Sequence, residues 1–384
     1  MKILWLAPIP YIDDNTSHPA PWIITLAKAL VESGIELTIL NYNSKIEEKV
    51  EKKDFDGIHI IYVKTPKLKQ NLLTVYKMRI NTMKNYLKTI IDDYALLHIH
   101  GSEHQYEVMA LDLKIPKLIS IQGIISEVIK VIPIIPNWKI YIEWKMSSLY
   151  EKKYLPKYQY FSCRTHWDTN YIKSINPRAK IYNIWEMIRE DFFEDHFSNE
   201  KKNILFVGGK NPIKGLVELL QAYNSSLQQI GLKLIILGKC QLNDIDGIIK
   251  KFNLSNINTN NIDCRGLQDI KGMIKAYEES FCLVHPTYID NSPNSVCEAQ
   301  LSGLPVIATD VGGVSSLIED KKTGLLIGKE SKDIETSVDR LLNDNDLRNF
   351  ISENAKKIAR HRHNPDLILQ QTLDIYHEIL RGQV

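Results

Sequence analysis

Residues 281–310 read FCLVHPTYIDNSPNSVCEAQLSGLPVIATD and contain two short apolar runs on either side of a helix-forming segment. The runs FCLVHP (281–286) and PVIATD (305–310) have the length and composition of buried strands. Ser292 followed by Pro293 predicts a helix start between them, because a serine side chain caps free N–H groups and the first helical position does not need the N–H that proline lacks. A strand, a helix and a strand in this order indicate a parallel sheet covered by helices.

The same alternation repeats along the chain in two series, one beginning at ILWLA (3–7) and the other at NILFVGG (203–209). It predicts two doubly wound, Rossmann-like α/β domains that face a common cleft beyond the carboxyl ends of their strands. The expected boundaries are an N-terminal domain 1–185, a charged hinge 186–202, a C-terminal domain 203–364 and a helix 365–384. The other expected strands are IELTIL (35–40), GIHIIYV (57–63), LLHIH (96–100), KLISIQ (117–122), YQYFSC (158–163), LKLIILG (232–238), CRGL (264–267) and TGLLI (323–327), and helices are expected at about 22–33, 215–230 and 269–277.

The composition excludes several classes of protein. The 384 residues are 44% hydrophobic and 24% charged, which is typical of a globular protein and not of a disordered or fibrous one. The net charge of +2 does not suggest a nucleic-acid partner. Five cysteines stand singly without metal-ligand spacing, which predicts reduced thiols in a cytoplasmic protein. The N-terminus lacks a signal-peptide pattern, and no apolar run reaches the roughly 18 residues of a membrane-spanning helix.

Two acids lie around the helix start near Pro293. The N–H groups of Asn294, Ser295 and Val296 are expected to be unpaired at the positive end of the helix, where a phosphate group binds favourably. Glu298 lies one turn further along and would accept hydrogen bonds from a sugar diol, while Asp290 would reach a second polar group. For two acids eight positions apart, the alternative interpretation is a turn cap at Asp290 and a solvated helix acid at Glu298.

The longer stretch HPTYIDNSPNSVCEAQLSGLPVIATDVGGVSSLIEDKKTGLLI (285–327) resembles the nucleotide-sugar signature of family-4 glycosyltransferases, which are retaining enzymes of the GT-B fold. The first acid of the family's pair is a glutamate, and Asp290 occupies its place here. VGGKNPIKGLVELLQAY (207–223) resembles the first strand, loop and helix of the same family's nucleotide domain. The family's lysine corresponds to Lys214, and its frequent arginine corresponds to Gly209, beside which Lys210 is a partial substitute.

The resemblance implies an activity and a set of residues. The enzyme would move a hexose from a nucleoside diphosphate sugar to a glycan or lipid-linked acceptor in capsule, O-antigen, lipopolysaccharide or other bacterial surface-polysaccharide synthesis. It would retain the anomeric configuration and need no metal or cofactor, and its helix 365–384 would cross back to the N-terminal domain. The implied catalytic residues are Lys214, Asp290 and His100, and the implied donor-binding residues are Gly208, Gly209, Lys210, Lys214, Gly266, Asp290, Ser292, Pro293, Asn294, Ser295, Val296 and Glu298.

The N-terminal half resembles the family less closely. LLHIHGSEHQYEVMALDL (96–113) resembles a strand–His–Gly element, in which His100 would contact the transferred sugar. A core or turn role is the alternative for His100, as it is for His98 and His104. FSCRTHWDTNYIKSINPRAKIYNIWEMIR (161–189) resembles a bacterial domain-end motif. A purely structural role for its Arg164, Trp167 and Asp168 is equally open. The first loop, APIPYIDDNTSHPAPW (7–22), carries Ser17 and His18 where many members have a glycine pair.

Two basic and aromatic stretches suggest where the acceptor is met. KLKQNLLTVYKMRINTMKNYLK (67–88) has six Lys or Arg and no acid, and residues 130–160 carry lysines among Trp138, Trp144 and several tyrosines. Such faces suit peripheral contact with the anionic inner surface of the plasma membrane. The alternative is ordinary amphipathic helices with solvated lysines.

Three other functions are alternatives to a transferase. A nicotinamide oxidoreductase would need a G-x-G-x-x-G after a strand, which VGGKNPIKG (207–215) does not supply. A GT-B sugar epimerase or phosphorylase is a closer alternative. A catalytically inactive nucleotide-sugar-binding protein is the third, because Asp290 and Gly209 replace the family's usual residues.

Overall fold

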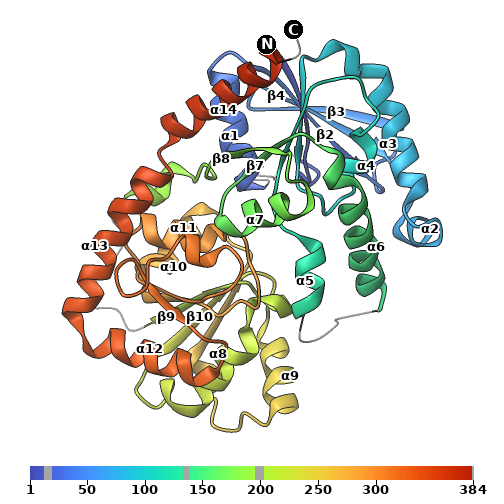
Figure 1. The fold of residues 1–384 in the computed structure, drawn as a ribbon. Coiled ribbons are helices and arrows are strands. Elements are labelled where there is room, and N and C mark those ends of the chain that lie inside the picture. Colours follow the sequence, from blue (N-terminus) through green and yellow to red (C-terminus); the bar gives the residue numbers. More distant parts are fainter. Residues whose placement is uncertain (13–19, 133–137, 195–202, 383–384) are drawn as a thin grey trace. The chain divides into compact units, whose positions relative to one another are not determined.

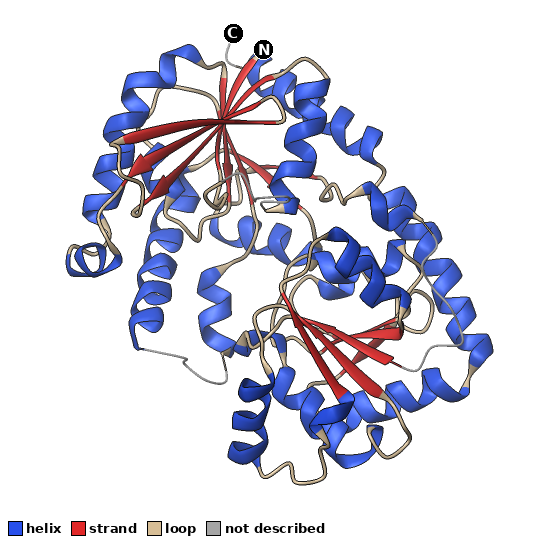
Figure 2. Cartoon of the chain, turned by 180° about the vertical axis from the view of Figure 1, so that it is seen from behind, coloured by secondary structure: helices blue, strands red, loops and turns tan. Residues whose placement is uncertain are grey.

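The structure is a computed structural model that describes residues 1–12, 20–132, 138–194 and 203–382. The chain divides into two compact units: the first comprises residues 1–131, 135–187 and 364–384, and the second comprises residues 132–134 and 188–363. Each unit contains its own parallel sheet with helices around it (Figures 1 and 2). The predicted fold class is therefore confirmed. Ser17, His18 and residues 195–202 of the predicted hinge lie outside the described residues.

The first unit has a sheet of eight strands in the described part of the chain, in the order β3-β4-β2-β1-β5-β6-β7-β8. All neighbours pair in parallel except β3, which is antiparallel to β4. The order places the carboxyl ends of β1, β2 and β4 side by side. The strands are β1 (Lys2–Leu6), β2 (Glu36–Asn43), β3 (Val50–Phe55), β4 (Ile58–Lys64), β5 (Leu96–His100), β6 (Lys117–Ser120), β7 (Tyr160–Cys163) and β8 (Lys180–Asn183).

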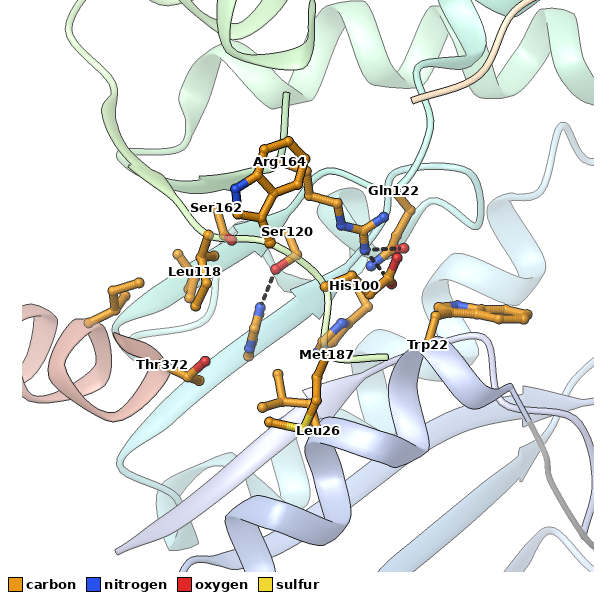
Figure 3. A pocket seen from close by; sticks show the side chains of 15 residues that line it. Trp22, Leu26, His100, Leu118, Ser120, Gln122, Ser162, Arg164, Met187 and Thr372 are labelled. Atoms are coloured by element: carbon orange, nitrogen blue, oxygen red, sulfur yellow. Dashed lines mark hydrogen bonds and ion pairs between the residues drawn. The ribbon is translucent and has the colours of Figure 1, made fainter. Parts of the chain in front are cut away.

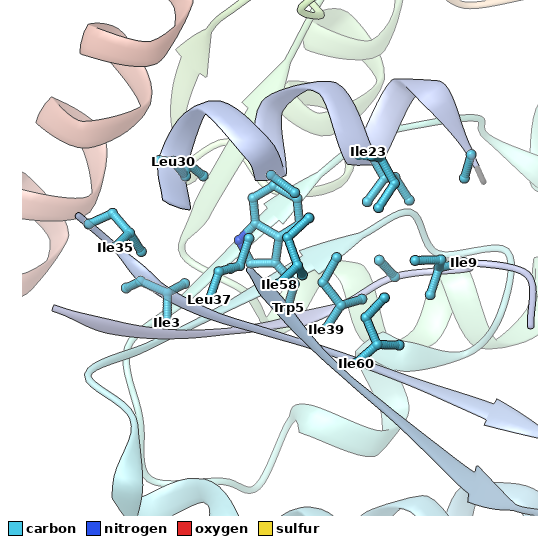
Figure 4. Packing of buried hydrophobic residues seen from close by; sticks show 14 of the residues in the cluster. Ile3, Trp5, Ile9, Ile23, Leu30, Ile35, Leu37, Ile39, Ile58 and Ile60 are labelled. Atoms are coloured by element: carbon cyan, nitrogen blue, oxygen red, sulfur yellow. The ribbon is translucent and has the colours of Figure 1, made fainter. Parts of the chain in front are cut away.

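Both faces of this sheet are buried. In β1, Ile3 and Trp5 join one apolar cluster and Leu4 and Leu6 join another, because successive side chains of a strand point to opposite faces. Figure 4 shows Trp5 beneath the first helix. The helices of the unit are α1 (Pro21–Glu32), α2 (Leu68–Leu73), α3 (Lys77–Ile90), α4 (Tyr106–Ala110), α5 (Ile125–Val131), α6 (Trp138–Tyr154), α7 (His166–Ile175) and α14 (Pro365–Arg381).

The last helix of the chain belongs to the first unit. Tyr376 of α14 is fully buried in the same cluster as Trp5, and the indole Nε1–H of Trp5 donates to its hydroxyl at 3.0 Å. Ile375 and Ile379 of α14 pack in this cluster too. This contact joins residues 371 positions apart in the sequence. The two ends of the chain are thus part of one core.

The second unit has a parallel sheet of six strands among the described residues, in the order β11-β10-β9-β12-β13-β14. Its core contains Ile204 and Phe206 of the central strand β9. The strands are β9 (Asn203–Val207), β10 (Lys233–Leu237), β11 (Ile262–Gly266), β12 (Ser280–His285), β13 (Val306–Thr309) and β14 (Leu325–Ile327). The helices are α8 (Leu216–Ala222), α9 (Leu242–Phe252), α10 (Ile270–Glu278), α11 (Asn294–Leu301), α12 (Ser331–Asn343) and α13 (Asn345–Arg362).

The structure differs from the sequence-based elements at several places. The strands β3 and β8 were not predicted, and the helix expected over 215–230 is α8 followed by a π-helical turn at Tyr223–Leu227. The predicted cap of α11 is wrong by one residue, since Pro293 is the N-cap and Ser292 precedes it without capping any N–H group. The helix accordingly begins at Asn294.

Candidate functional site

Lys214 and Asp290 meet at the carboxyl edge of the second sheet. Lys214 ends a 3₁₀ turn (Pro212–Lys214) that follows β9, and Asp290 lies in the loop that follows β12. Because β9 and β12 are paired neighbours, the loops at their carboxyl ends lie together. The ammonium group of Lys214 donates to Asp290 Oδ2, and His285 Nε2 lies 3.2 Å from the same oxygen. The side chain of Lys214 keeps 22% exposure, so part of this cation is accessible.

The charges in this cluster follow from burial and pairing. Burial alone would raise the pKa of Asp290, but the Lys214 charge and a hydrogen bond from His285 outweigh it and hold the pKa below its usual value. Burial lowers the pKa of His285, more than Asp290 raises it. His285 is therefore neutral at neutral pH, and its Nε2–H donates to the carboxylate. The cluster consists of a cation, an anion and a neutral donor.

Glycines allow the three loops of this edge to approach one another. Gly215 has φ +77°, and a side chain there would collide with the carbonyl of Pro286. Gly312 has φ +56°, and a side chain there would collide with the carbonyl of Asp290. The N–H of Gly313 donates to that same carbonyl at 2.9 Å. Gly312 and Gly313 thus hold the loop of Asp290 in place.

The start of α11 lies in the same loop. The N–H of Val296 donates to the carbonyl of Pro293 at 3.0 Å, so the prediction that it is unpaired is wrong. The N–H groups of Asn294 and Ser295 have no hydrogen-bond partner among the described residues. Two of the three predicted donors are therefore available for an anion.

Glu298 is buried in α11 with 3% exposure, so the alternative of a solvated helix acid is wrong. Its Oε1 accepts a hydrogen bond from the guanidinium of Arg189 at 2.8 Å, and its Oε2 accepts one from the hydroxyl of Tyr277 at 3.2 Å. Burial raises the pKa of Glu298 in spite of these partners. Sequence reasoning missed Arg189, which lies in the segment that we expected to be a hinge. The only signal for it would have been that a buried acid needs a cation.

The remaining predicted donor residues lie along the same sheet edge. Lys210 follows β9, but its ammonium pairs with Asp244 at 2.7 Å and is exposed. Gly209 has φ +53° and packs against the backbone of Lys239, and Gly208 lies against the side chain of Lys214. Gly266 ends β11 and accepts the N–H of Gly238 at 2.8 Å.

His100 belongs to the first unit, whereas Lys214 and Asp290 belong to the second. It ends β5 and lines a small pocket with a volume of about 40 Å³ (Figure 3). The neighbouring His98 is fixed in the core, because its Nδ1 lies 2.7 Å from the Tyr376 hydroxyl and its Nε2 lies 2.7 Å from Ser120 Oγ. His104 Nδ1 pairs with the Tyr42 hydroxyl at 2.9 Å. The Nε2 of His100, by contrast, is buried without a partner among the described residues.

Charge in the His100 pocket is balanced by an ion pair. Burial, followed by the nearby His98 and Arg164, holds the pKa of His100 well below its usual value, so the ring is neutral. Arg164 pairs with Glu186 at 2.8 Å and donates to Gln122 at 2.5 Å (Figure 3). Asp168 accepts the N–H groups of Arg164 and Thr165 at the start of α7, which is a structural capping role.

Comparison with known proteins shows what the second unit is similar to. Residues 187–358 match the model of the family described as glycosyl transferases group 1. This part of the chain is similar to a glycosyltransferase domain. It is 27% identical over 186 residues to the capsular polysaccharide biosynthesis glycosyltransferase CapM of Staphylococcus aureus, and the match covers 48% of each chain. The chain spans about half the length of the curated relatives that match it first, at 45% and 48%.

Solved structures extend the likeness to the first unit. Sucrose-phosphate synthase from Thermosynechococcus elongatus is similar over 99% of both chains, with a TM-score of 0.79 and 16% identity. HepE of Anabaena, solved in complex with UDP-glucose, is similar over 98% of this chain and 100% of its own, with a TM-score of 0.70 and 15% identity. These likenesses show the GT-B fold.

Among the described residues, no helix combines the length and the apolar character required to cross a lipid bilayer. No group of three or more potential metal ligands occurs in the part of the chain that the structure describes.

Proposed function

We propose that the chain is a retaining glycosyltransferase of the family-4 type that transfers a hexose from a nucleoside diphosphate sugar to a hydroxyl of a glycan or lipid-linked acceptor. The observation that carries this proposal is the cluster of Lys214, Asp290 and His285 beyond the strands of a group 1 domain. It offers an accessible cation beside an ionised acid, which is what a charged leaving group and a hydroxylated sugar require.

The donor would be held by the loops of the second unit. Its diphosphate would accept hydrogen bonds from Lys214 and from the N–H groups of Asn294 and Ser295. Binding of the diphosphate would compete for the Lys214 ammonium and leave Asp290 to accept hydrogen bonds from the sugar. Glu298 would accept the ribose hydroxyls, since a carboxylate has about four acceptor sites and Arg189 and Tyr277 use two of them. UDP is the first nucleotide to test, because HepE was solved with UDP-glucose.

The chemical step would rest on positioning and on neutralising charge. The bond between the anomeric carbon and the diphosphate oxygen breaks, and the acceptor oxygen bonds to the same face of that carbon. The acceptor's proton passes to the departing diphosphate, whose developing charge Lys214 stabilises. Neutral His100, with its unpartnered Nε2, would hydrogen-bond a hydroxyl of the transferred sugar.

The acceptor is proposed to be part of a surface polysaccharide such as a capsule, O-antigen or lipopolysaccharide glycan, because the similar protein CapM is a glycosyltransferase of capsular polysaccharide biosynthesis. Around α2 and the start of α3, large apolar side chains are exposed, with Leu73 at 77%. Lysines lie beside them in the same stretch. An apolar patch within a basic stretch supports peripheral contact with the anionic inner face of the plasma membrane. The patch consists of Leu68, Leu73, Val75 and Met78 with Lys67, Lys69 and Lys77.

A panel of nucleotide sugars tests the donor site. We expect one of them to raise the melting temperature of the wild-type chain, and Lys214→Met to abolish the rise. Lys329→Met is the matched control, because Lys329 is an exposed lysine of the same unit outside the cluster. A rise that persists in Lys214→Met would refute the donor assignment.

Product analysis separates the competing activities. A transferase releases a nucleoside diphosphate and forms a glycoside, and retention predicts that the product has the donor's anomeric configuration by NMR. A phosphorylase would yield a sugar phosphate, and an epimerase would yield an isomerised sugar. Tight donor binding without release of nucleotide, with or without acceptor, would indicate the inactive binding protein.

A further inference from the structure

The largest concentration of unsatisfied polar groups surrounds a second cavity of the first unit. This cavity, with a volume of about 400 Å³, lies where β1, β2 and β4 end, and residues of α2 and α3 contribute to its wall. The carboxyl end of an open parallel sheet is the usual place for a ligand, and 400 Å³ is within the range of small-molecule sites. Its polar lining includes Asn41, Tyr42, Thr65, Asn71 and Arg79.

Arg79 of α3 supplies a positive charge at this cavity with only 5% exposure. Its guanidinium carbon lies 4.4 Å from the ring centres of both Tyr42 and Tyr76. One terminal nitrogen donates to the Tyr42 hydroxyl at 2.9 Å and the other donates to Gln105 Oε1. All of these partners are neutral. The Nε–H of Arg79 has no partner, and none of the ion pairs among the described residues includes Arg79.

The nearby acids form no ion pair with Arg79 among the described residues. Burial raises the pKa of Glu107 well above its usual value, which disfavours the charged form of this carboxyl group. Glu143 of α6 raises the pKa of both Tyr42 and Tyr76, so its carboxylate lies near Arg79. A buried cation without an ion-pair partner is costly, and an anionic ligand would reduce that cost.

Two further residues of the cavity wall specify what the anion carries. The Thr65 hydroxyl is buried without a partner and can donate to an anion. The side-chain nitrogen of Asn71 donates to the carbonyl of Pro66 at 2.7 Å, which fixes the orientation of its amide. Asn71 Oδ1 is then an acceptor without a partner, and it requires a donor such as a hydroxyl. A ligand that satisfies all three residues is therefore an anion that also carries hydroxyl groups.

We infer that this cavity binds a hydroxylated anion, a sugar acid or a sugar phosphate, as the part of the acceptor that the first unit recognises. The guanidinium of Arg79 and the hydroxyl of Thr65 donate to the anionic group, and Asn71 accepts from a neighbouring hydroxyl. Binding of the anion follows from the cavity alone, whereas its description as an acceptor group rests on the proposed transferase function.

Calorimetric titration of the full chain tests the inference with three probes: glucuronate, glucose 6-phosphate and neutral glucose. We expect at least one of the two anions to bind and glucose not to bind, and the anion that binds more tightly identifies the acidic group. Thr65→Val keeps the shape of the side chain and removes a hydroxyl that has no partner, so it should lower the affinity about three- to tenfold without lowering the melting temperature. Thr89→Val, at an exposed threonine of α3 outside the cavity, is the matched control and should bind as the wild type does.

Substitution of Arg79 gives the larger effect. Arg79→Lys keeps the charge but loses the planar fork, and we expect it to weaken anion binding by more than tenfold. If loss of the stacking on Tyr42 and Tyr76 unfolds this variant, the Thr65→Val and Thr89→Val pair decides the question alone. Absence of binding by both anions, or equal affinity in wild type and Thr65→Val, would overturn the inference.

The donor panel separates this result from the proposed function. A melting-temperature rise with a nucleotide sugar that depends on Lys214, together with no anion binding, would refute only the cavity assignment. Anion binding that depends on Thr65, without any response to nucleotide sugars, would leave the cavity assignment standing and refute the transferase proposal.

Discussion

In the second unit, the charged side chains at the carboxyl edge of the sheet are paired with one another, whereas the corresponding edge of the first unit keeps several buried polar atoms without partners. Lys214 pairs with Asp290 and Arg189 pairs with Glu298. Arg79 Nε, Thr65 Oγ1 and His100 Nε2 have no such partner among the described residues. The pairs keep the second unit stable without a ligand, but a ligand must then compete with them. The unpartnered atoms of the first unit are stabilised only when a ligand supplies partners.

The largest expected effect breaks the buried pair of the second unit. Arg189→Met leaves the carboxyl of Glu298 buried without its cation, and removal of one partner of such a pair costs about 3–5 kcal/mol of unfolding free energy. The pKa of Glu298, already raised by burial, should rise further. A carboxyl group with a raised pKa in the folded state binds protons more tightly there than in the unfolded chain, so stability falls as pH rises. Urea unfolding should therefore show that Arg189→Met loses more unfolding free energy at about pH 8 than at about pH 5.

A double variant provides the control for this prediction. Arg189→Met combined with Glu298→Gln removes the uncompensated acid, and it should recover part of the stability that Arg189→Met loses. Additive losses from the two substitutions would show that Arg189 and Glu298 contribute independently and would contradict the pairing.

The next effect concerns catalysis at the accessible pair. Lys214→Met removes the proposed stabiliser of the leaving diphosphate, and the loss of one such group lowers kcat by about 100- to 1,000-fold. Steady-state kinetics with the best donor of the panel measures this loss, and Lys329→Met should retain wild-type kcat. A Lys214→Met enzyme with a raised KM and unchanged kcat would place Lys214 in ground-state binding only.

A smaller effect distinguishes the two units by their response to acid. Burial lowers the pKa of His98 to about 3 and of His104 to about 4. In the unfolded chain a histidine titrates near 6.5, so between these values the unfolded state binds more protons and stability falls as pH falls. At about pH 5 each of the two would cost about 2 kcal/mol. Asp290 affects stability only at lower pH. Because its pKa is lowered in the folded state, its contribution to the unfolding free energy stays intact until the pH falls below the usual aspartate range.

Hydrogen exchange resolves this difference along the chain. Protection of β5, which contains His98, and of α4, which follows His104, should fall between about pH 6 and pH 5, while protection of β12 in the second unit falls less. His285 is the corresponding buried histidine of the second unit, and its contact with the ionised Asp290 opposes the lowering of its pKa. Equal loss of protection in both units would show that the buried histidines of the first unit do not dominate its acid response.

The comparison also shows what could be predicted from the sequence. Apolar strands such as FCLVHP (281–286) are identifiable because both of their faces are buried, whereas β3 reads VEKKDF and pairs only with β4 at the edge of the sheet. The Lys214 and Asp290 loops were predictable because each lies in a contiguous motif. Arg189 was not, because its partner Glu298 lies 109 positions away and no local pattern marks such a pair. The surroundings of His100 were likewise not predictable, because the residues that line its pocket come from β6, β7 and α14, which are distant in the sequence.

The smallest expected effect tests whether the donor site uses one cation or two. Lys210 is exposed, and its ammonium is paired with Asp244 at the start of α9. Exposed pairs of this kind contribute little, so Lys210→Gln should change the melting temperature hardly at all and the donor affinity by less than about twofold. Isothermal titration with the best nucleotide sugar, beside Lys214→Met and Lys329→Met, measures this. If Lys210→Gln lost as much donor affinity as Lys214→Met, Lys210 would have to leave Asp244 when the diphosphate binds. Both lysines that follow β9 would then hold the donor.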